Sequence, residues 1–153
     1  MNIRVIWPGK TQEEWVRRGI DEYAGRIRRY VQLDLAEARE EKGGSAEAMR
    51  EREGERLARL VPKSARLILL DERGEEMTSP DFAGVLSRYR DGGISDLVFA
   101  IGGAYGVSDA FRSRADKVIA LSRMTFTHQM VRVFLLEQIY RGFTIINNEP
   151  YHH

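Results

Sequence analysis

The chain has 153 residues, 42% of them hydrophobic, and no cysteine. This length predicts a single domain over residues 1–153, and this composition supports a packed core and excludes an intrinsically disordered chain. Without cysteine, the protein has no disulfide, no thiolate metal site and no cysteine nucleophile. No apolar run approaches the length of a membrane span, and the sequence begins directly with strand-like residues. We therefore expect a cytoplasmic protein without a signal peptide, membrane contact or bound metal.

The net charge is only +1, which is not typical of a nucleic-acid-binding protein. Its distribution is uneven, because residues 1–30 hold seven basic and four acidic side chains, and residues 111–141 hold six basic and two acidic ones. Four of the 24 basic residues are lysine and the others are arginine, whose planar guanidinium suits phosphate groups. Arginine is also favoured by GC-rich coding and by adaptation to heat. The charge pattern alone therefore leaves phosphate binding as one of two interpretations.

The first elements of the chain read as a strand, a helix and a second strand. The segment IRVIW predicts a strand at residues 3–7, followed by a PGK turn. At residues 11–29 the apolar side chains recur at helical spacing, and Thr11 with Glu14 fits a capping box. Residues 31–38 alternate apolar and polar side chains, as a half-buried strand does.

A charged helix and a buried strand follow. Residues 46–60 predict either a solvated helix with many ion pairs or a helical surface that faces RNA or a partner. Residues 65–74 contain a continuous apolar run that stops at an acid, as in strands buried on both faces of a parallel sheet. Residues 79–90 predict a helix in which Ser79 is the cap and Pro80 takes the first position.

The remaining elements are a strand at residues 97–106, a helix at 108–115, a strand at 117–122 and a helix at 124–143. Ser108 or Asp109 is expected to cap the first of these helices, and Thr125 or Thr127 the second. Strands that alternate with helices predict an α/β fold, with a mostly parallel sheet covered by helices on both faces.

Three loops that follow buried strands carry groups suited to a ligand: LLDERG, IGGAYG and LSRMTFTH. In an open parallel sheet, ligands bind beyond the carboxyl ends of the strands. Gly102 and Gly103 allow the backbone to approach a ligand closely, although GGAYG fits neither dinucleotide nor P-loop spacing and also suits a simple tight turn. The hydroxyls of Ser122, Thr125 and Thr127, with Met124 and Phe126, suit a pocket for an aromatic base with a thioether or sugar attached, although the threonines also suit a cap of the next helix.

The helix at 124–143 is apolar around most of its circumference, which predicts burial on more than one side. Six polar side chains interrupt it: His128, Gln129, Arg132, Glu137, Gln138 and Arg141. Buried polar groups need partners, in a subunit interface, in a ligand or in one another. The alternative is that Glu137 and Arg141 form a local pair and that His128 is an ordinary core histidine.

The chain ends in EPYHH, which is stiff, aromatic and titratable. Tyr151 can stack on a base, and His152 can accept or pass a proton near neutral pH. A terminal histidine pair is also how a purification tag can begin.

The motifs IGGAYG, LSRMTFTHQMVRV, EQIYRGF and NEPYH occur together and in order. With WPGKTQEEWVRRGIDEYAGRI and REGERL, they resemble the large-subunit rRNA pseudouridine methyltransferases of the SPOUT superfamily over nearly the whole chain. The resemblance implies a SPOUT-type α/β fold with a C-terminal trefoil knot, S-adenosylmethionine as cofactor, and a homodimer whose pocket is completed by the partner chain. It assigns cofactor binding to Leu70, Gly102, Gly103, Leu121, Ser122, Arg123, Met124, Thr125 and Phe126.

The resemblance also implies the substrate, ring nitrogen 3 of pseudouridine 1915 of 23S rRNA in the assembled ribosome. It implies that Tyr151 and His152 lie near the target base, with His152 as proton acceptor, while His128 and Arg132 organise the pocket. Thr127, Gly142 and His153 depart from the family pattern, which usually has proline, a small residue such as alanine, and lysine or arginine there. The alternatives are a related knotted methyltransferase acting on tRNA or another rRNA base, and a non-catalytic RNA-binding module associated with the ribosome.

Overall fold

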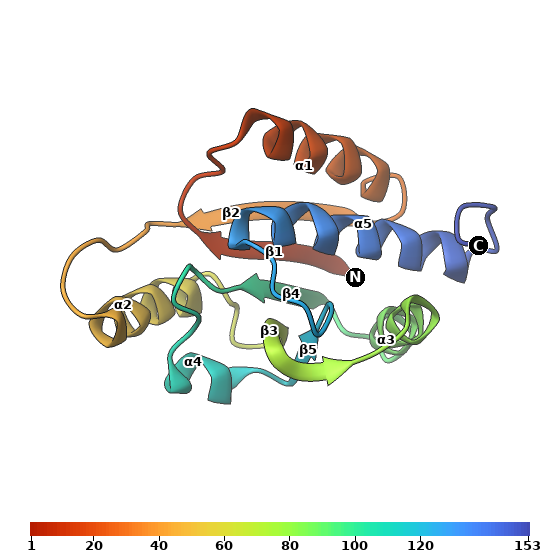
Figure 1. The fold of residues 1–153 in the computed structure, drawn as a ribbon. Helices are drawn as coiled ribbons and strands as arrows, with labels where there is room; N and C mark the ends of the chain where they lie inside the picture. Colours follow the sequence, from red (N-terminus) through yellow and green to blue (C-terminus); the bar gives the residue numbers. More distant parts are fainter.

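Five parallel strands form one sheet in the order β2-β1-β4-β3-β5 (Figure 1). The computed structural model describes all residues, 1–153. The strands are β1 (Asn2–Pro8), β2 (Gln32–Ala38), β3 (Arg66–Glu76), β4 (Asp96–Ile101) and β5 (Lys117–Ala120). The helices are α1 (Glu14–Ile27), α2 (Ala46–Arg59), α3 (Ser79–Asp91), α4 (Asp109–Arg114) and α5 (His128–Ile146). The predicted α/β architecture with a parallel sheet is confirmed.

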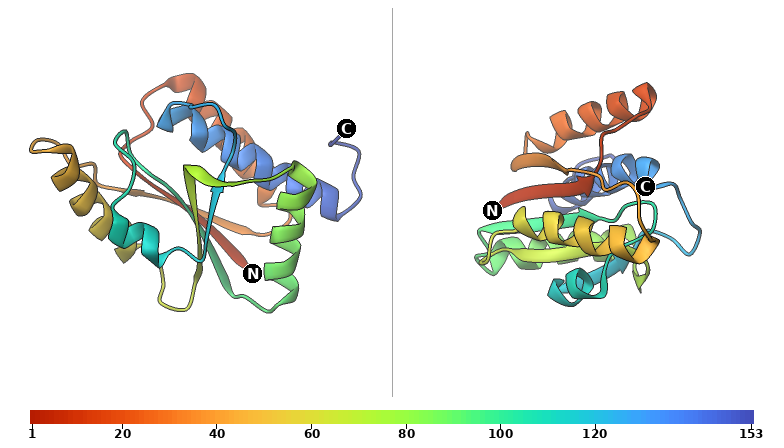
Figure 2. Two further views of the ribbon diagram at one scale, coloured as in Figure 1. Left: turned by 60° about the horizontal axis from the view of Figure 1, so that its bottom comes forward. Right: turned by 90° about the vertical axis from the view of Figure 1, so that its left-hand side faces the viewer.

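Helices cover both faces of this sheet. In Figure 1, α1 and α5 lie on one side of the sheet and α2 and α4 on the other, and the second view in Figure 2 agrees. Helix α5 packs against both α1 and α3. In β3, Ile68 and Leu70 face the core on the α5 side, whereas Leu67 and Leu69 face the core beside α2 and α4. The continuous apolar run in β3 is thus explained by burial of both strand faces, as the sequence predicts.

Two predicted helix caps are confirmed. The hydroxyl of Ser108 accepts a hydrogen bond from the amide of Phe111 at 3.2 Å at the start of α4. The hydroxyl of Thr127 accepts one from the amide of Met130 at 3.2 Å at the start of α5. Each bond satisfies an amide that has no partner inside the helix.

Two other predicted caps are wrong, because tertiary partners take the hydroxyl groups. No capping box starts α1, since Thr11 is buried and its hydroxyl accepts from Arg132 instead. At α3 the cap is Thr78, which forms a capping box with Asp81. The Ser79 hydroxyl instead donates to Oε1 of Gln138 on α5, at 2.6 Å.

Several element ends also differ from the sequence prediction. Strand β4 ends at Ile101 rather than at residue 106, because residues 103–106 form a tight turn with an isolated bridge between Gly103 and Gly106. Residues 121–127 form a loop, so β5 ends earlier and α5 begins later than predicted.

Strand β3 extends beyond the predicted end and bends around β5. Leu70 and Glu75 both pair with Ile119, so residues 71–74 form an irregular bend between two parallel pairings. The bend requires a glycine at position 74, since a Cβ there would lie 2.6 Å from the carbonyl carbon of Ile119.

No helix combines the length and the apolar composition that a membrane crossing requires.

Candidate functional site

The loops predicted to bind the cofactor begin side by side. All strands are parallel, so their carboxyl ends share one edge of the sheet. Leu70 pairs with Ile101 of β4 on one side and with Ile119 of β5 on the other. Gly102 directly follows Ile101, and Leu121 directly follows the last residue of β5, Ala120. The structure thus brings together the starts of the three loops that the sequence singled out.

A cavity of about 290 Å³ opens beside the last of these loops. Three of the predicted cofactor residues line it, namely Leu121, Ser122 and Phe126. Its other lining residues are Met77, Thr78, Ser79, Phe82, Ile119, Ala120, Phe134, Glu137 and Gln138. The Phe126 and Phe134 rings meet edge to face, with centroids 5.1 Å apart. Aromatic walls with a few polar groups suit a flat, partly polar ligand such as an adenosine derivative.

Hydrogen bonds shape the loop at residues 121–127. The Ser122 hydroxyl accepts from the amide of Met124 at 3.0 Å. The Thr125 hydroxyl donates to Oε2 of Glu72 at 2.8 Å, which ties the loop to the bend in β3. Arg123 and Met124 point outward, and Met124 is 75% exposed. The loop therefore presents its hydroxyl at Ser122 and its ring at Phe126 to the cavity.

The two glycines after β4 sit in close packing. A Cβ at Gly102 would lie 2.9 Å from Cγ1 of Val107, and one at Gly103 would lie 2.7 Å from Oε1 of Glu53. Burial raises the pKa of that Glu53 carboxyl. The tight-turn interpretation of GGAYG is confirmed by the turn itself, and cofactor binding by Gly102 and Gly103 stays a prediction.

Arg132, one of the predicted catalytic residues, is fully buried and holds the segment after β1. Its Nη2 donates to the carbonyl oxygen of Pro8 and its Nη1 to the hydroxyl of Thr11, each at 2.9 Å. The guanidinium lies over the Trp7 ring, 4.9 Å from the centroid. Burial lowers the pKa of Arg132 to about 10. Arg132 therefore acts on the shape of the β1–α1 connection.

His128 lies one helical turn before Arg132 and is partly buried. Burial, together with the positive charge of Arg132, lowers the pKa of the His128 imidazole. The next side chain, Gln129, accepts from the amide of Gln12 at 3.0 Å and donates to the carbonyl oxygen of Lys10 at 3.2 Å. The start of α5 thus holds the segment at residues 8–12, which the sequence did not mark as part of the site.

The C-terminal tail folds back onto the end of α5 (Figure 2). Arg141 donates to Oε1 of Glu137 through Nε at 2.9 Å and Nη2 at 2.6 Å, which confirms the local pair. The Tyr151 hydroxyl donates to the same oxygen at 3.1 Å, and the Tyr151 ring meets the Tyr140 ring edge to face. Nη1 of Arg141 lies 3.0 Å from Nδ1 of His152.

The predicted catalytic residues therefore form two groups in one chain. His128 and Arg132 belong to the first half of α5, and Tyr151 and His152 contact its second half at Glu137, Tyr140 and Arg141. At about 1.5 Å per residue, Arg132 and Arg141 are about 13 Å apart along the helix axis. The cavity reaches the second group, because Glu137 is part of its wall.

Sequence reasoning missed several residues of this site. Phe82, Phe134 and Met77 line the cavity but carry no pattern of their own. One signal was present on α5, since Phe134, Glu137, Gln138 and Arg141 are spaced three or four residues apart and share one helix face. That spacing links the aromatic wall of the cavity to the ion pair that holds the tail.

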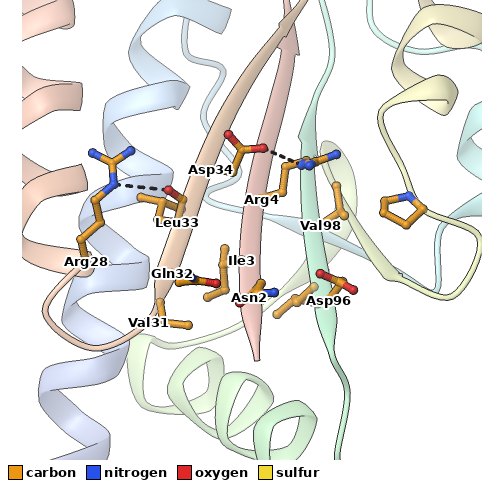
Figure 3. A pocket seen from close by; sticks show the side chains of 12 residues that line it. Asn2, Ile3, Arg4, Arg28, Val31, Gln32, Leu33, Asp34, Asp96 and Val98 are labelled. Carbon is orange, nitrogen blue, oxygen red and sulfur yellow. Dashed lines mark hydrogen bonds and ion pairs between the residues drawn. The ribbon is translucent and has the colours of Figure 1, made fainter.

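A larger cavity of about 540 Å³ lies at the opposite edge of the sheet, by the amino ends of β1, β2 and β4 (Figure 3). Among its lining residues, Arg4 pairs with Asp34 at 2.8 Å and Nε of Arg28 donates to the carbonyl oxygen of Leu33 at 3.3 Å. Ligands of open parallel sheets bind at the carboxyl edge. We therefore place the candidate site in the smaller cavity.

Comparison with known protein families indicates what kind of site lies at the carboxyl edge of the sheet. A family model described as predicted SPOUT methyltransferase matches residues 1–152. The chain belongs to this family. Membership confirms the SPOUT-type fold class and implies a methyl donor, whereas the trefoil knot stays a prediction. No group of three or more histidine, aspartate or glutamate side chains is placed to hold a metal ion in this SPOUT methyltransferase.

Close relatives of this SPOUT methyltransferase carry one name, "Ribosomal RNA large subunit methyltransferase H". The protein of that name from Geotalea uraniireducens is 77% identical over 153 residues, which are 100% of both chains. Those from Geobacter sulfurreducens and Trichlorobacter lovleyi are 72% and 57% identical, again over 100% of both chains. A crystal structure of a probable methyltransferase from Bordetella pertussis Tohama I matches with a TM-score of 0.61 at 12% identity, over 92% of this chain and 93% of that chain. This last similarity supports the fold alone.

Proposed function

We propose that this protein transfers the methyl group of S-adenosylmethionine to ring nitrogen 3 of a pseudouridine in large-subunit rRNA, within assembled ribosomes. The observation that carries the proposal is full-length identity of 77% and 72% to relatives named as large-subunit rRNA methyltransferases. The choice of pseudouridine and of nitrogen 3 rests on the resemblance of the C-terminal motifs. A ribosomal substrate puts the site of action in the cytoplasm.

The cavity beside residues 121–127 is the proposed binding site of the methyl donor. Phe82, Phe126 and Phe134 supply flat apolar surface for the adenine ring, and Ser122 supplies a hydroxyl. Leu70, Gly102 and Gly103 begin the neighbouring loops and would border the same donor. When bound, the donor supplies a methyl group already activated by its sulfonium. What remains for the protein is to align nitrogen, methyl carbon and sulfur and to keep that geometry.

We also propose that the protein acts as a homodimer in which each tail completes the partner's site. This proposal is supported by the separation of about 13 Å between the two groups of predicted catalytic residues along α5. It is also supported by exposed apolar side chains, since Met124 is 75% exposed in the proposed cofactor loop and Trp15 is 53% exposed on α1. A partner's Tyr151 and His152 would cover such a loop and exclude water from the methyl group.

A labelled methyl donor tests this function. The protein is incubated with the donor and, separately, with assembled ribosomes, protein-free rRNA and tRNA, and the label in each RNA is counted. The proposal predicts label in the large-subunit rRNA of assembled ribosomes. Label that appears in tRNA, or in rRNA only when it is protein-free, would contradict the proposed substrate. Calorimetry that detects no binding of the donor would indicate a non-catalytic RNA-binding module.

A further inference from the structure

The side chain of His152 is held through one ring nitrogen. Nη1 of Arg141 lies 3.0 Å from Nδ1 of His152. A guanidinium has donors only, so Nδ1 is the acceptor in this contact. A neutral imidazole that accepts at Nδ1 carries its proton on Nε2. The contact with Arg141 therefore selects the tautomer of His152 that has a proton on Nε2.

Glu137 fixes Arg141 in the orientation that makes this contact. Nε and Nη2 of Arg141 both donate to Oε1 of Glu137, which leaves Nη1 directed at the imidazole. Oε1 also accepts from the Tyr151 hydroxyl at 3.1 Å, and Oε2 accepts from Gln138 at 3.0 Å. Glu137 thus accepts four hydrogen bonds, three of them at Oε1. Glu137 is therefore engaged as a structural acceptor and is not a free base.

Tyr151 is also a donor in this cluster. Burial, with the hydrogen bond to Glu137 as a further cause, raises the pKa of its hydroxyl, which stays protonated at neutral pH. Tyr151 therefore uses its proton on Glu137, and Nδ1 of His152 is occupied by Arg141, which leaves the Nε2 proton of His152 as the donor of the tail without a partner in this cluster.

We propose that His152 serves the reaction as a hydrogen-bond donor through Nε2, with Arg141 and Glu137 as positioning residues that set its tautomer. This inference rests on the proposed function. The proton of ring nitrogen 3 passes to water, the nitrogen electron pair forms the bond to the methyl carbon, and the carbon–sulfur bond breaks with its electrons passing to sulfur. The negative charge of the deprotonated ring spreads onto the two carbonyl oxygens beside nitrogen 3, and the Nε2 proton of His152 stabilises that charge.

This assignment replaces the expectation from the sequence that His152 accepts the proton. It holds whether the tail serves its own chain or a partner, because Glu137, Arg141 and His152 belong to one chain and move together.

The tautomer can be read directly by nitrogen-15 NMR of the free protein. The chain has three histidines, and the variant His153→Gln removes the exposed one and so assists the assignment. We expect His152 to show an unprotonated Nδ1 and a protonated Nε2. In Arg141→Met, which has no donor, both tautomers should appear, and Arg141→Lys should restore the original one. A proton on Nδ1 of His152 in the parent protein, or an unchanged spectrum in Arg141→Met, would overturn the inference.

Two substitutions of His152 distinguish a role as hydrogen-bond donor from a role as general base. Glutamine places an amide N–H near the position of Nε2, whereas asparagine reaches only the position of Nδ1, and neither side chain can act as a base. A donor role predicts that His152→Gln keeps activity within about tenfold, while His152→Asn loses about 100-fold. Equal, severe losses in both would contradict the donor role. If the parent protein is inactive on ribosomes, the proposed function fails, and the NMR result still decides the tautomer.

Discussion

The guanidinium of Arg132 on α5 donates to the carbonyl oxygen of Pro8 at the end of β1, across 2.9 Å, while it is fully buried. The same side chain binds the Thr11 hydroxyl and covers the Trp7 ring. No carboxylate forms an ion pair with it. Arg132 thus joins α5 to the connection between β1 and α1 through hydrogen bonds and packing.

Replacing Arg132 with alanine should lower the free energy of unfolding by about 3 kcal/mol, because two buried acceptors lose their donor and Trp7 loses its packing. Urea denaturation measures the loss. Arg18→Ala is the matched control, since Arg18 is exposed and forms no ion pair, and its effect should stay within about 0.5 kcal/mol. Equal effects of the two substitutions would show that the Arg132 contacts contribute nothing to stability.

His128 should make the protein less stable in mild acid. Burial and the charge of Arg132 lower its pKa in the folded state below the ordinary value of 6.5. As pH falls through 6.5, the unfolded chain binds a proton that the folded chain resists, so the free energy of unfolding decreases. The decrease should be smaller in His128→Gln, and unaltered in His153→Gln, whose imidazole is exposed. Urea denaturation at several pH values between about 8 and 5 measures this decrease in the free energy of unfolding. The same dependence on pH in the parent protein and in His128→Gln would contradict the prediction.

Ser122 should contribute to binding of the methyl donor. Its hydroxyl accepts from the amide of Met124 and so shapes the loop that lines the cavity. Ser122→Ala should weaken binding by about fivefold, the equivalent of one hydrogen bond of about 1 kcal/mol. Calorimetry with S-adenosylhomocysteine measures the affinity, with the exposed Ser113→Ala as control. Unchanged affinity in Ser122→Ala would place the donor elsewhere.

A mixed dimer tests whether each tail serves the partner's site. One chain carries Gly102→Val, whose added Cβ would lie 2.9 Å from Cγ1 of Val107 and so displace the loop, and the other carries His152→Ala. If the tail acts across the dimer, the mixed dimer holds one site with an intact loop and an intact tail. It should then be active although each parent dimer is not.

Two controls make this result decisive. Calorimetry should show that Gly102→Val no longer binds the donor while His152→Ala does, and light scattering should show dimers in every sample. An inactive mixed dimer would mean that each chain builds its own site, and a monomer in light scattering would contradict the homodimer itself.

The sequence alone predicted the interior of the helices and strands, but it did not predict the residues at which several of them begin and end. The apolar runs of β3 and β4 predicted strands buried on both faces, because each face of these strands packs on its own core cluster. The ends depend on contacts between distant segments. Thr11 does not cap α1 because Arg132, 121 residues later, takes its hydroxyl. Ser79 does not cap α3 because its hydroxyl donates a hydrogen bond to Gln138 instead.

The candidate site also has a part that the sequence predicts and a part that it does not. Loops at the ends of neighbouring strands were predictable, since parallel strands place their carboxyl ends at one edge. The aromatic walls at Phe82 and Phe134 were not, because an apolar residue that lines a cavity has the same helical spacing as one that fills the core. The partners of the tail were also hidden, since Glu137 and Arg141 read equally well as a surface pair.

Mass spectrometry of nucleosides from treated ribosomes tests whether the protein methylates pseudouridine on ring nitrogen 3. Two ribosome preparations are compared, one with pseudouridine and one with unmodified uridine at the target position of the large-subunit rRNA. We predict a pseudouridine that is one methyl group heavier, with the methyl on ring nitrogen 3, in the first preparation and only after addition of protein and donor. A methyl group on any other base or ring position, or equal methylation of the uridine-bearing ribosomes, would contradict it.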